Sequence, residues 1–265
     1  MNQIALGRYI PLDSVMHKMD PRAKILAMFI LLIAIFLPAG FEGYAILGIV
    51  IMLAVLLSKL KLNFIIRAMK PMMLMLVFLL VINILVLKTG YVLVDINGFK
   101  IYSEAIFQTL YITIRLVLMI MITTLLTATT KPLDLTLGIE LLLEPLRRFK
   151  VPAHEIAMMI SIALRFIPTL IEETQRIMKA QASRGVDLQE GTIKEKIMAI
   201  LSLIVPLFVS AFQRAEDLAN AMESRGYAPG AKRTRYKVLR WAARDSILMI
   251  CAAILTIGIG VLVVL

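Results

Sequence analysis

The sequence predicts an all-α integral membrane protein with about five transmembrane helices plus long cytoplasmic or interfacial helices. Three observations predict this class. Hydrophobic residues make up 60% of the 265 residues and mean hydropathy is +0.87, whereas a soluble domain contains roughly 45 to 50% apolar residues. Long uncharged runs alternate with clusters of Lys and Arg, and a charged region separates the last such run from the others.

Six uncharged runs approach the length of a membrane span, which needs about 20 residues with charged residues tolerated at the ends. Most of them are bounded by charged or turn-forming residues. The runs are 25–41, 43–58, 71–87, 116–130, 197–213 and 246–265.

Basic residues set the expected orientation, because Lys- and Arg-rich loops stay in the cytoplasm. Segments 1–24 and 59–70 are basic and are expected inside, whereas 38–43 and 88–104 carry few basic residues and are expected outside. The residues around Asn97-Gly98 alternate at a period of two, which predicts a small external β-hairpin. With five spans, the N-terminus is cytoplasmic and the C-terminus extracellular.

The run 197–213 leaves two topologies open. As a sixth span it would place the two Ser-Arg-Gly sequences at 183–185 and 224–226 on opposite sides of the membrane, with the basic run 232–240 outside. We therefore expect an apolar helix at the membrane interface, and six spans as the alternative.

Three regions follow from this reading. Residues 1–130 form a transmembrane region with four spans, 131–240 a cytoplasmic coupling-helix region, and 241–265 a C-terminal transmembrane helix. Within the middle region, apolar residues at helical spacing and helix start and stop signals predict helices over 133–149, 153–183 and 192–224. Its basic run 232–241, ending in a tryptophan, is typical of an interfacial stop in contact with anionic lipid. Nucleic-acid binding is disfavoured, because no aromatic stacking surface accompanies the charge.

Two of these helices end in the same tripeptide. Glycine is the preferred residue after the last helical turn, and arginine there suits the negative end of the helix dipole. Arg184 continues the apolar stripe of its helix, and Arg225 does the same on the next helix, which favours a socket on another protein. The full predicted contact set is Ser183, Arg184, Gly185, Ser224, Arg225 and Gly226.

The same helices carry features expected at a helix crossing. Pro168 and Pro206 remove backbone donors and bend or break their helices. Ala211, Ala215 and Ala219 place small residues at a spacing of four, which permits close approach.

No catalytic, cofactor-binding or metal site is expected. His17 and His154 lack a second ligand at metal spacing and are interpreted as structural. Asp20 is interpreted as a helix N-cap before a first-turn proline. Arg115, inside the fourth apolar segment, is expected to pair with a polar group of another helix.

Three stretches together resemble one known family. They are SVMHKMDPRAKIL at 14–26, ALRFIPTLIEETQRIMKAQASRG at 163–185 and AFQRAEDLANAMESRGY at 211–227. The chain resembles the transmembrane T component of energy-coupling factor transporters, which are ATP-driven importers of vitamins or transition-metal ions in the cell membrane.

The resemblance implies a non-catalytic subunit that needs no cofactor. It implies that the helix ends at Arg184 and Arg225 bind two cytoplasmic ATP-binding cassette ATPases. It further implies that the crossed helices support a membrane-embedded, substrate-binding S component. A self-contained secondary permease is the alternative, and it needs a substrate site near the membrane midplane. An intramembrane enzyme is a further class, and it needs a catalytic group inside the spans.

Overall fold

The computed structural model describes residues 9–38, 40–96, 99–149, 152–186, 192–228 and 238–264. These residues divide into two compact units, which are described separately. One contains the described residues between Gly7 and Leu142 and between Leu239 and Leu265. The other contains those between Leu143 and Val238.

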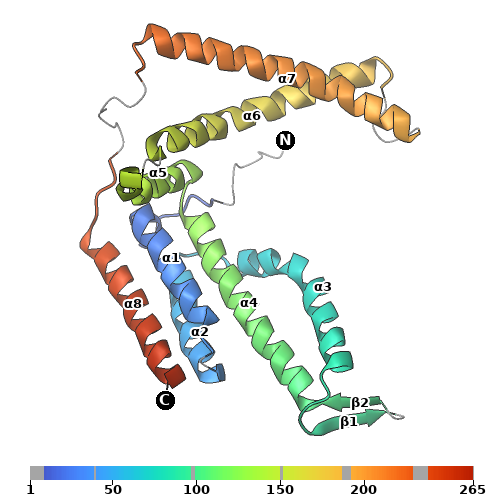
Figure 1. Ribbon diagram of the computed structural model, residues 1–265, viewed down its shortest axis with the longest axis vertical. Helices are drawn as coiled ribbons and strands as arrows, with labels where there is room; N and C mark the ends of the chain where they lie inside the picture. Colours follow the sequence, from blue (N-terminus) through green and yellow to red (C-terminus); the bar gives the residue numbers. More distant parts are fainter. Residues whose placement is uncertain are drawn as a thin grey trace. The chain divides into compact units, whose positions relative to one another are not determined.

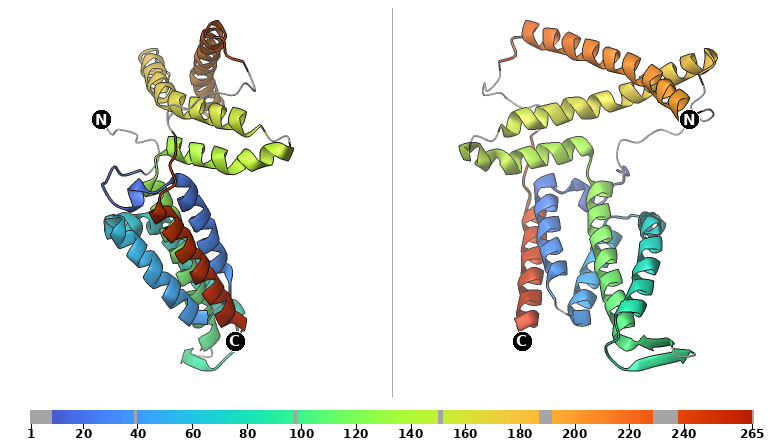
Figure 2. Two further views of the ribbon diagram at one scale, coloured as in Figure 1. Left: turned by 90° about the vertical axis from the view of Figure 1, so that its left-hand side faces the viewer. Right: turned by 45° about the vertical axis from the view of Figure 1, so that its right-hand side comes forward.

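The first unit, called here the membrane unit, consists mainly of helices that lie side by side (Figures 1 and 2). A short 3-10 helix, Met16–Lys18, precedes them. The helices are α1 (Pro21–Phe36), α2 (Gly40–Leu57), α3 (Leu62–Val86), α4 (Ser103–Thr129), α5 (Pro132–Leu143) and α8 (Ala243–Val264). Helix α3 bends in Figure 1, and Pro71 inside it removes a backbone donor.

The predicted hairpin is present between α3 and α4. Strand β1 (Val92–Ile96) pairs antiparallel with β2 (Phe99–Tyr102), in a register that places Ile96 opposite Phe99. The expected turn residues Asn97 and Gly98 lie outside the described part of the chain.

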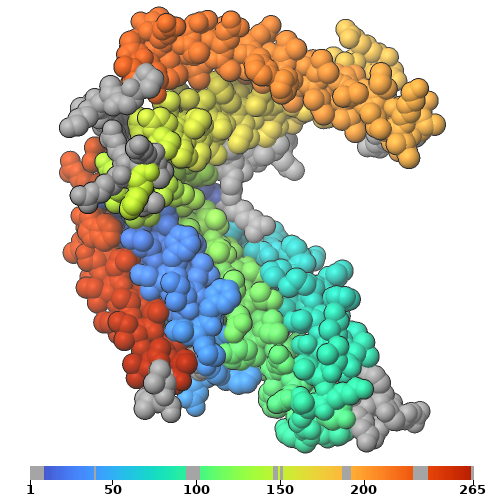
Figure 3. Space-filling view, in the orientation of Figure 1, coloured from blue at the N-terminus to red at the C-terminus, as the bar shows by residue number. Residues whose placement is uncertain are grey.

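The core of the membrane unit lies where α1, α2, α4 and α8 meet. Ile35, Leu47, Ile51 and Ile259 are fully buried in it, and Leu118 is nearly so. Side chains of α8 pack against those of α1, in red and blue in Figure 3. The fold class expected from composition is therefore confirmed: the protein is an all-α membrane protein apart from one small hairpin.

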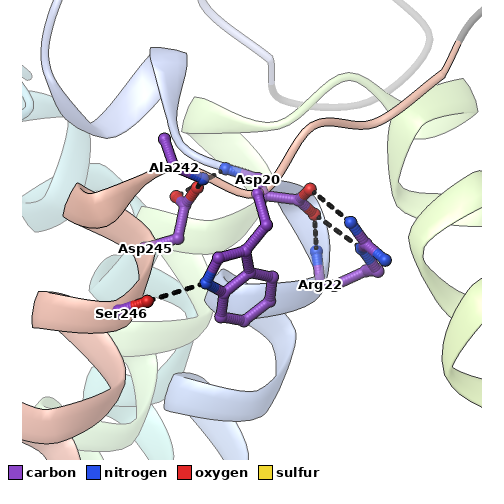
Figure 4. A network of polar contacts seen from close by, with 6 residues as sticks. Asp20, Arg22, Ala242, Asp245 and Ser246 are labelled. Atoms are coloured by element: carbon purple, nitrogen blue, oxygen red, sulfur yellow. Dashed lines mark hydrogen bonds and ion pairs between the residues drawn. The ribbon is translucent and has the colours of Figure 1, made fainter.

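A buried carboxylate joins the N-termini of α1 and α8 (Figure 4). Asp245, 1% exposed, accepts a hydrogen bond from the backbone N–H of Asp20 at 2.9 Å and another from that of Ala242 at 2.8 Å. Asp20 in turn caps α1 by accepting from the backbone N–H of Arg22 at 2.9 Å. The predicted N-cap is confirmed, and the two helices begin on the same side of the unit.

A buried lysine joins the beginning of α1 to the end of α4. The ammonium of Lys24 donates to the carbonyl of Thr129 and to the hydroxyl of Thr130, both at 3.1 Å. These acceptors lie at the C-terminus of α4, where a cation is favoured by the helix dipole. The start of α1, the end of α4 and the start of α8 therefore share one side, and α8 ends on the other.

Arg115 pairs with another helix, as expected. Its Nε donates to the Tyr44 hydroxyl at 2.7 Å, and that hydroxyl donates to the carbonyl of Ile35 at 3.1 Å. This places the guanidinium against protein rather than hydrocarbon.

Two sequence expectations about element bounds are wrong. The run 25–41 is divided by a break after Phe36, and α2 already begins at Gly40. The α-helix expected over 133–149 ends at Leu143 and continues as a 3-10 helix, Glu144–Phe149. Pro145 explains this, because it lacks a backbone donor and disfavours the α conformation of the residue before it.

Length and composition alone allow six described helices to cross a membrane: α2, α3, α4, α6, α7 and α8. Helix α1 has 16 residues and is too short for that criterion. Helices α6 (Ala153–Ser183) and α7 (Ile193–Ser224) belong to the second unit, called here the coupling unit. The regional division at 131 and 240 stays a prediction.

Candidate functional site

The coupling unit is built on two long helices with the bounds expected from the sequence. Helix α7 begins at a capping box. The Thr192 hydroxyl accepts from the Glu195 backbone N–H at 3.4 Å, and the Glu195 carboxylate accepts from the Thr192 backbone N–H at 2.8 Å. This reciprocal pair satisfies two donors at the helix start and fixes where α7 begins.

Helix α6 ends in a Schellman motif formed by the first Ser-Arg-Gly sequence. The Val186 N–H bonds to the carbonyl of Gln181 at 3.1 Å, and the Gly185 N–H bonds to that of Ala182 at 3.0 Å. Gly185 has φ +81°, in the left-handed region where glycine is favoured. The chain therefore turns sharply away directly after Arg184.

Helix α7 ends in the same way. The Tyr227 N–H bonds to the carbonyl of Met222 at 2.9 Å, and the Gly226 N–H bonds to that of Glu223 at 2.8 Å. Gly226 has φ +71°. The repeated tripeptide is thus a repeated structure, as expected from glycine at the position after the last helical turn.

Both arginines occupy the same place in these motifs. Arg184 has φ −90° and ψ 7°, and Arg225 has φ −90° and ψ 10°. Both are exposed, and within the described residues no hydrogen bond or ion pair is recorded for either guanidinium. Each therefore presents a planar, permanently charged donor group that suits a carboxylate or helix-end carbonyls of another protein.

The two helices run antiparallel and cross. Gln181 near the end of α6 contacts Ser202 in α7, whereas Glu173 contacts Arg214 farther along α7. Each helix is roughly 45 Å long at 1.5 Å per residue. The arginine ends consequently lie at opposite ends of the pair (Figure 1), which suits two separate binding sites.

A proline creates one of the crossing contacts. Pro206 has no N–H, so the carbonyl of Ser202, four residues earlier, lacks its helical donor. The side-chain amide of Gln181 donates to this carbonyl at 3.1 Å. Helix α7 continues through Pro206, and the carbonyl that this proline leaves without a helical donor is the point at which α6 is bonded to α7.

An ion pair supplies the second crossing contact. Arg214 Nη2 lies 3.1 Å from Glu173 Oε2, with side chains 33% and 19% exposed. Arg176 approaches the same oxygen at 3.9 Å. A partly exposed pair of this kind contributes about 0.2 to 1 kcal/mol, so it sets the register of the helices more than their stability.

The other predicted crossing residues are placed less uniformly. Ala211 and Pro168 are half-buried, whereas Ala215, Ala219 and Pro206 are exposed in the chain by itself. Their role at a crossing or under a partner stays a prediction.

Helix α7 presents an apolar surface that the described residues do not cover. The large side chains of this surface are between 45% and 61% exposed, and the rings of Phe208 and Phe212 meet edge to face with centroids 4.7 Å apart. This surface, called here the α7 apolar face, consists of Ile197, Leu201, Ile204, Val205, Phe208 and Phe212. Exposed apolar area of this extent marks a protein or membrane contact.

The model of the family described as "CbiQ: Cobalt transport protein" matches residues 13–236. The chain belongs to this family. The match includes both Ser-Arg-Gly ends, the α6–α7 crossing and the α7 apolar face.

Curated relatives extend the likeness of this CbiQ-family chain over nearly its whole length. The energy-coupling factor transporter transmembrane protein EcfT of Bacillus subtilis is 44% identical over 255 residues, which are 96% of each chain. That of Macrococcus caseolyticus is 47% identical over 93% of each chain, and that of Lactococcus lactis 44% over 97%. These names describe a transmembrane component of a transporter, and the resemblance seen in the sequence is confirmed.

Sequence reasoning missed Gln181, whose amide completes the crossing. The sequence does predict the acceptor of this contact, because Pro206 has no N–H and leaves the carbonyl of Ser202 without its helical donor. It does not predict the donor. We expect Gln181→Leu to leave that carbonyl without a donor and to weaken the crossing by about 1 kcal/mol. Amide hydrogen exchange in α7 should then be about five-fold faster.

Gln175→Leu is the matched control, because Gln175 is an exposed residue of the same helix. Equal exchange rates in the two variants would show that the Gln181 amide does not hold the helices together.

Proposed function

We propose that this chain is the coupling subunit of an ATP-driven energy-coupling factor importer. In this proposal two cytoplasmic ATPases bind the ends of α6 and α7. A membrane-embedded S component rests on apolar surfaces of this chain and delivers a vitamin or a transition-metal ion. The chain itself hydrolyses nothing and scaffolds the other subunits in the cell membrane.

The observation that carries the proposal is the duplicated helix end. Two Schellman motifs present two exposed arginines in the same backbone conformation at opposite ends of one crossed pair. This arrangement matches two identical, or two similar, binding sites on partner proteins. A substrate pathway through a permease has no need for it.

The mechanism follows from how α6 and α7 are joined. Each helix is a continuous rod that ends at an arginine, and the Gln181–Ser202 and Glu173–Arg214 contacts link the two rods near their crossing. When the ATPases move together on binding ATP, each displaces one arginine end. Because the rods are connected, the displacement changes their crossing and so moves the α7 apolar face that would support the S component.

The orientation is part of the same proposal. The basic segments 1–24 and 59–70 place the start of α1 in the cytoplasm. Since α8 begins beside α1 at Asp245, the C-terminus is then extracellular. This reading favours five spans, with α6 and α7 at the cytoplasmic interface.

Reconstitution into proteoliposomes tests the proposal against the permease alternative. We expect the chain alone to catalyse no uptake, and uptake to appear only when both ATPases, an S component and ATP are present. Substrate accumulation by the chain alone, with or without an ion gradient, would establish a self-contained permease instead.

A further inference from the structure

An apolar cavity lies inside the membrane unit, where α1, α2, α4 and α8 surround it. Its volume is about 90 Å³, and apart from the ends of Lys24 and Thr129 its lining is nearly all hydrocarbon. Apolar cavities do not hold ordered water, which needs polar partners, but they bind hydrocarbon ligands.

The lining residues define the shape of the cavity. Helix α1 contributes Lys24, Ala27, Met28 and Leu31, and α4 and α8 each contribute four residues at the same spacing of three, four and seven. Such a stripe spans two helical turns, so the cavity is roughly 10 Å long and runs along the helices. That length is about two-thirds of one leaflet of the roughly 30 Å hydrocarbon core.

One end and one side of the cavity are distinctive. Lys24 and Thr129 lie at the end where α1 begins, which is the side of the basic segments. Along the side, the small residues Ala54 of α2 and Cys251 of α8 both line the cavity, and Cys251 is exposed. The cavity therefore opens between α2 and α8, toward the surface that the surrounding lipid contacts.

From this geometry we infer that the cavity binds a segment of one acyl chain of a membrane phospholipid, which enters between α2 and α8. The chain lies parallel to the helices, with its polar end on the side of Lys24 and its hydrocarbon toward Leu31 and Leu255. An elongated apolar space with a lateral opening fits a flexible alkyl chain. Filling it restores the dispersion contacts that the lining side chains would otherwise lose.

Native mass spectrometry of the purified full-length chain, delipidated in detergent and then supplied with palmitoyl-oleoyl phosphatidylglycerol, tests this inference. We expect one phospholipid to be retained at activation energies that strip the others. Ala54→Phe places a ring at the opening, and we expect it to reduce retention at least ten-fold. Cys251→Phe is a second variant at the same opening, in case Ala54→Phe fails to fold.

Ala45→Phe is the matched control, because Ala45 is an exposed residue of α2 that does not line the cavity. It should retain the lipid as the unchanged chain does. The same lipid should raise the thermal midpoint of the unchanged chain and of Ala45→Phe, but not that of Ala54→Phe.

Three results would overturn the inference. The first is no tightly held lipid in the unchanged chain, and the second is equal retention by Ala54→Phe and Ala45→Phe. The third is that Ala54→Phe and Cys251→Phe both lose a copurifying membrane protein and keep the lipid. That result would make the opening a protein interface.

Discussion

Reversing both arginine ends, with Arg184→Glu and Arg225→Glu together, is expected to reduce copurification of the ATPases to background while the chain remains in the membrane. Each ATPase would lose one arginine, whose guanidinium can make two hydrogen bonds to a carboxylate. At about 1.5 to 3 kcal/mol for each hydrogen bond to a charged group, this corresponds to at least a hundred-fold weaker binding of each ATPase. The new carboxylates would in addition repel an acidic socket. Affinity purification from membranes, followed by quantification of the ATPases, measures the effect.

The matched control reverses two other exposed charges on the same helices. Arg165 lies in the middle of α6, and Lys194 lies in the first turn of α7, where an acidic residue is tolerated by the helix dipole. Arg165→Glu with Lys194→Glu should retain the ATPases. If both double variants lose them, the effect is one of net charge, and the arginine ends have no special part in binding.

Replacing Asp245 by alanine is expected to cause the largest loss of stability among single substitutions in the membrane unit. The carboxylate is buried and accepts from two backbone donors, those of Asp20 and Ala242. Each buried donor left without a partner costs about 1 to 3 kcal/mol. The thermal unfolding midpoint of the purified chain should fall by several degrees, with α8 detaching from α1.

Asp245→Asn tests the loss of a hydrogen-bond acceptor without a change in the size of the side chain. Its amide keeps one acceptor oxygen but introduces an NH₂ group where the second acceptor was, so we expect an intermediate loss. Asp13→Ala is the control at a carboxylate that is almost fully exposed in its ion pair with Lys18. An unchanged midpoint for Asp245→Ala would mean that the junction in Figure 4 does not hold the helices together.

The helices of the coupling unit were predictable because their signals are local. The bounds of α6 and α7 follow from apolar periodicity, from glycine after the last turn, and at Thr192 from a capping threonine. The N-cap at Asp20 is local in the same sense. Pro145 is a local signal too. Because proline disfavours the α conformation of the residue before it, it predicts that the helix expected over 133–149 ends at Leu143.

The contacts between helices were not predictable from one sequence. In the sequence Lys24 is one of several positive charges before the first span, yet in the structure it is buried and bonds to residues more than 100 positions later. Asp245 bonds to the backbone of Asp20 across 225 positions. For Arg115, the low polarity of its surroundings predicted that a partner exists, but only the packing of α2 against α4 identifies Tyr44.

A structure of the assembled transporter, determined by electron cryo-microscopy at a resolution that shows side chains, tests the central claim most directly. The account predicts that the guanidinium groups of Arg184 and Arg225 each lie within hydrogen-bonding distance of carboxylates or carbonyls of a separate ATPase. Two solvated guanidinium groups, with the ATPases bound at another surface of the chain, would contradict it.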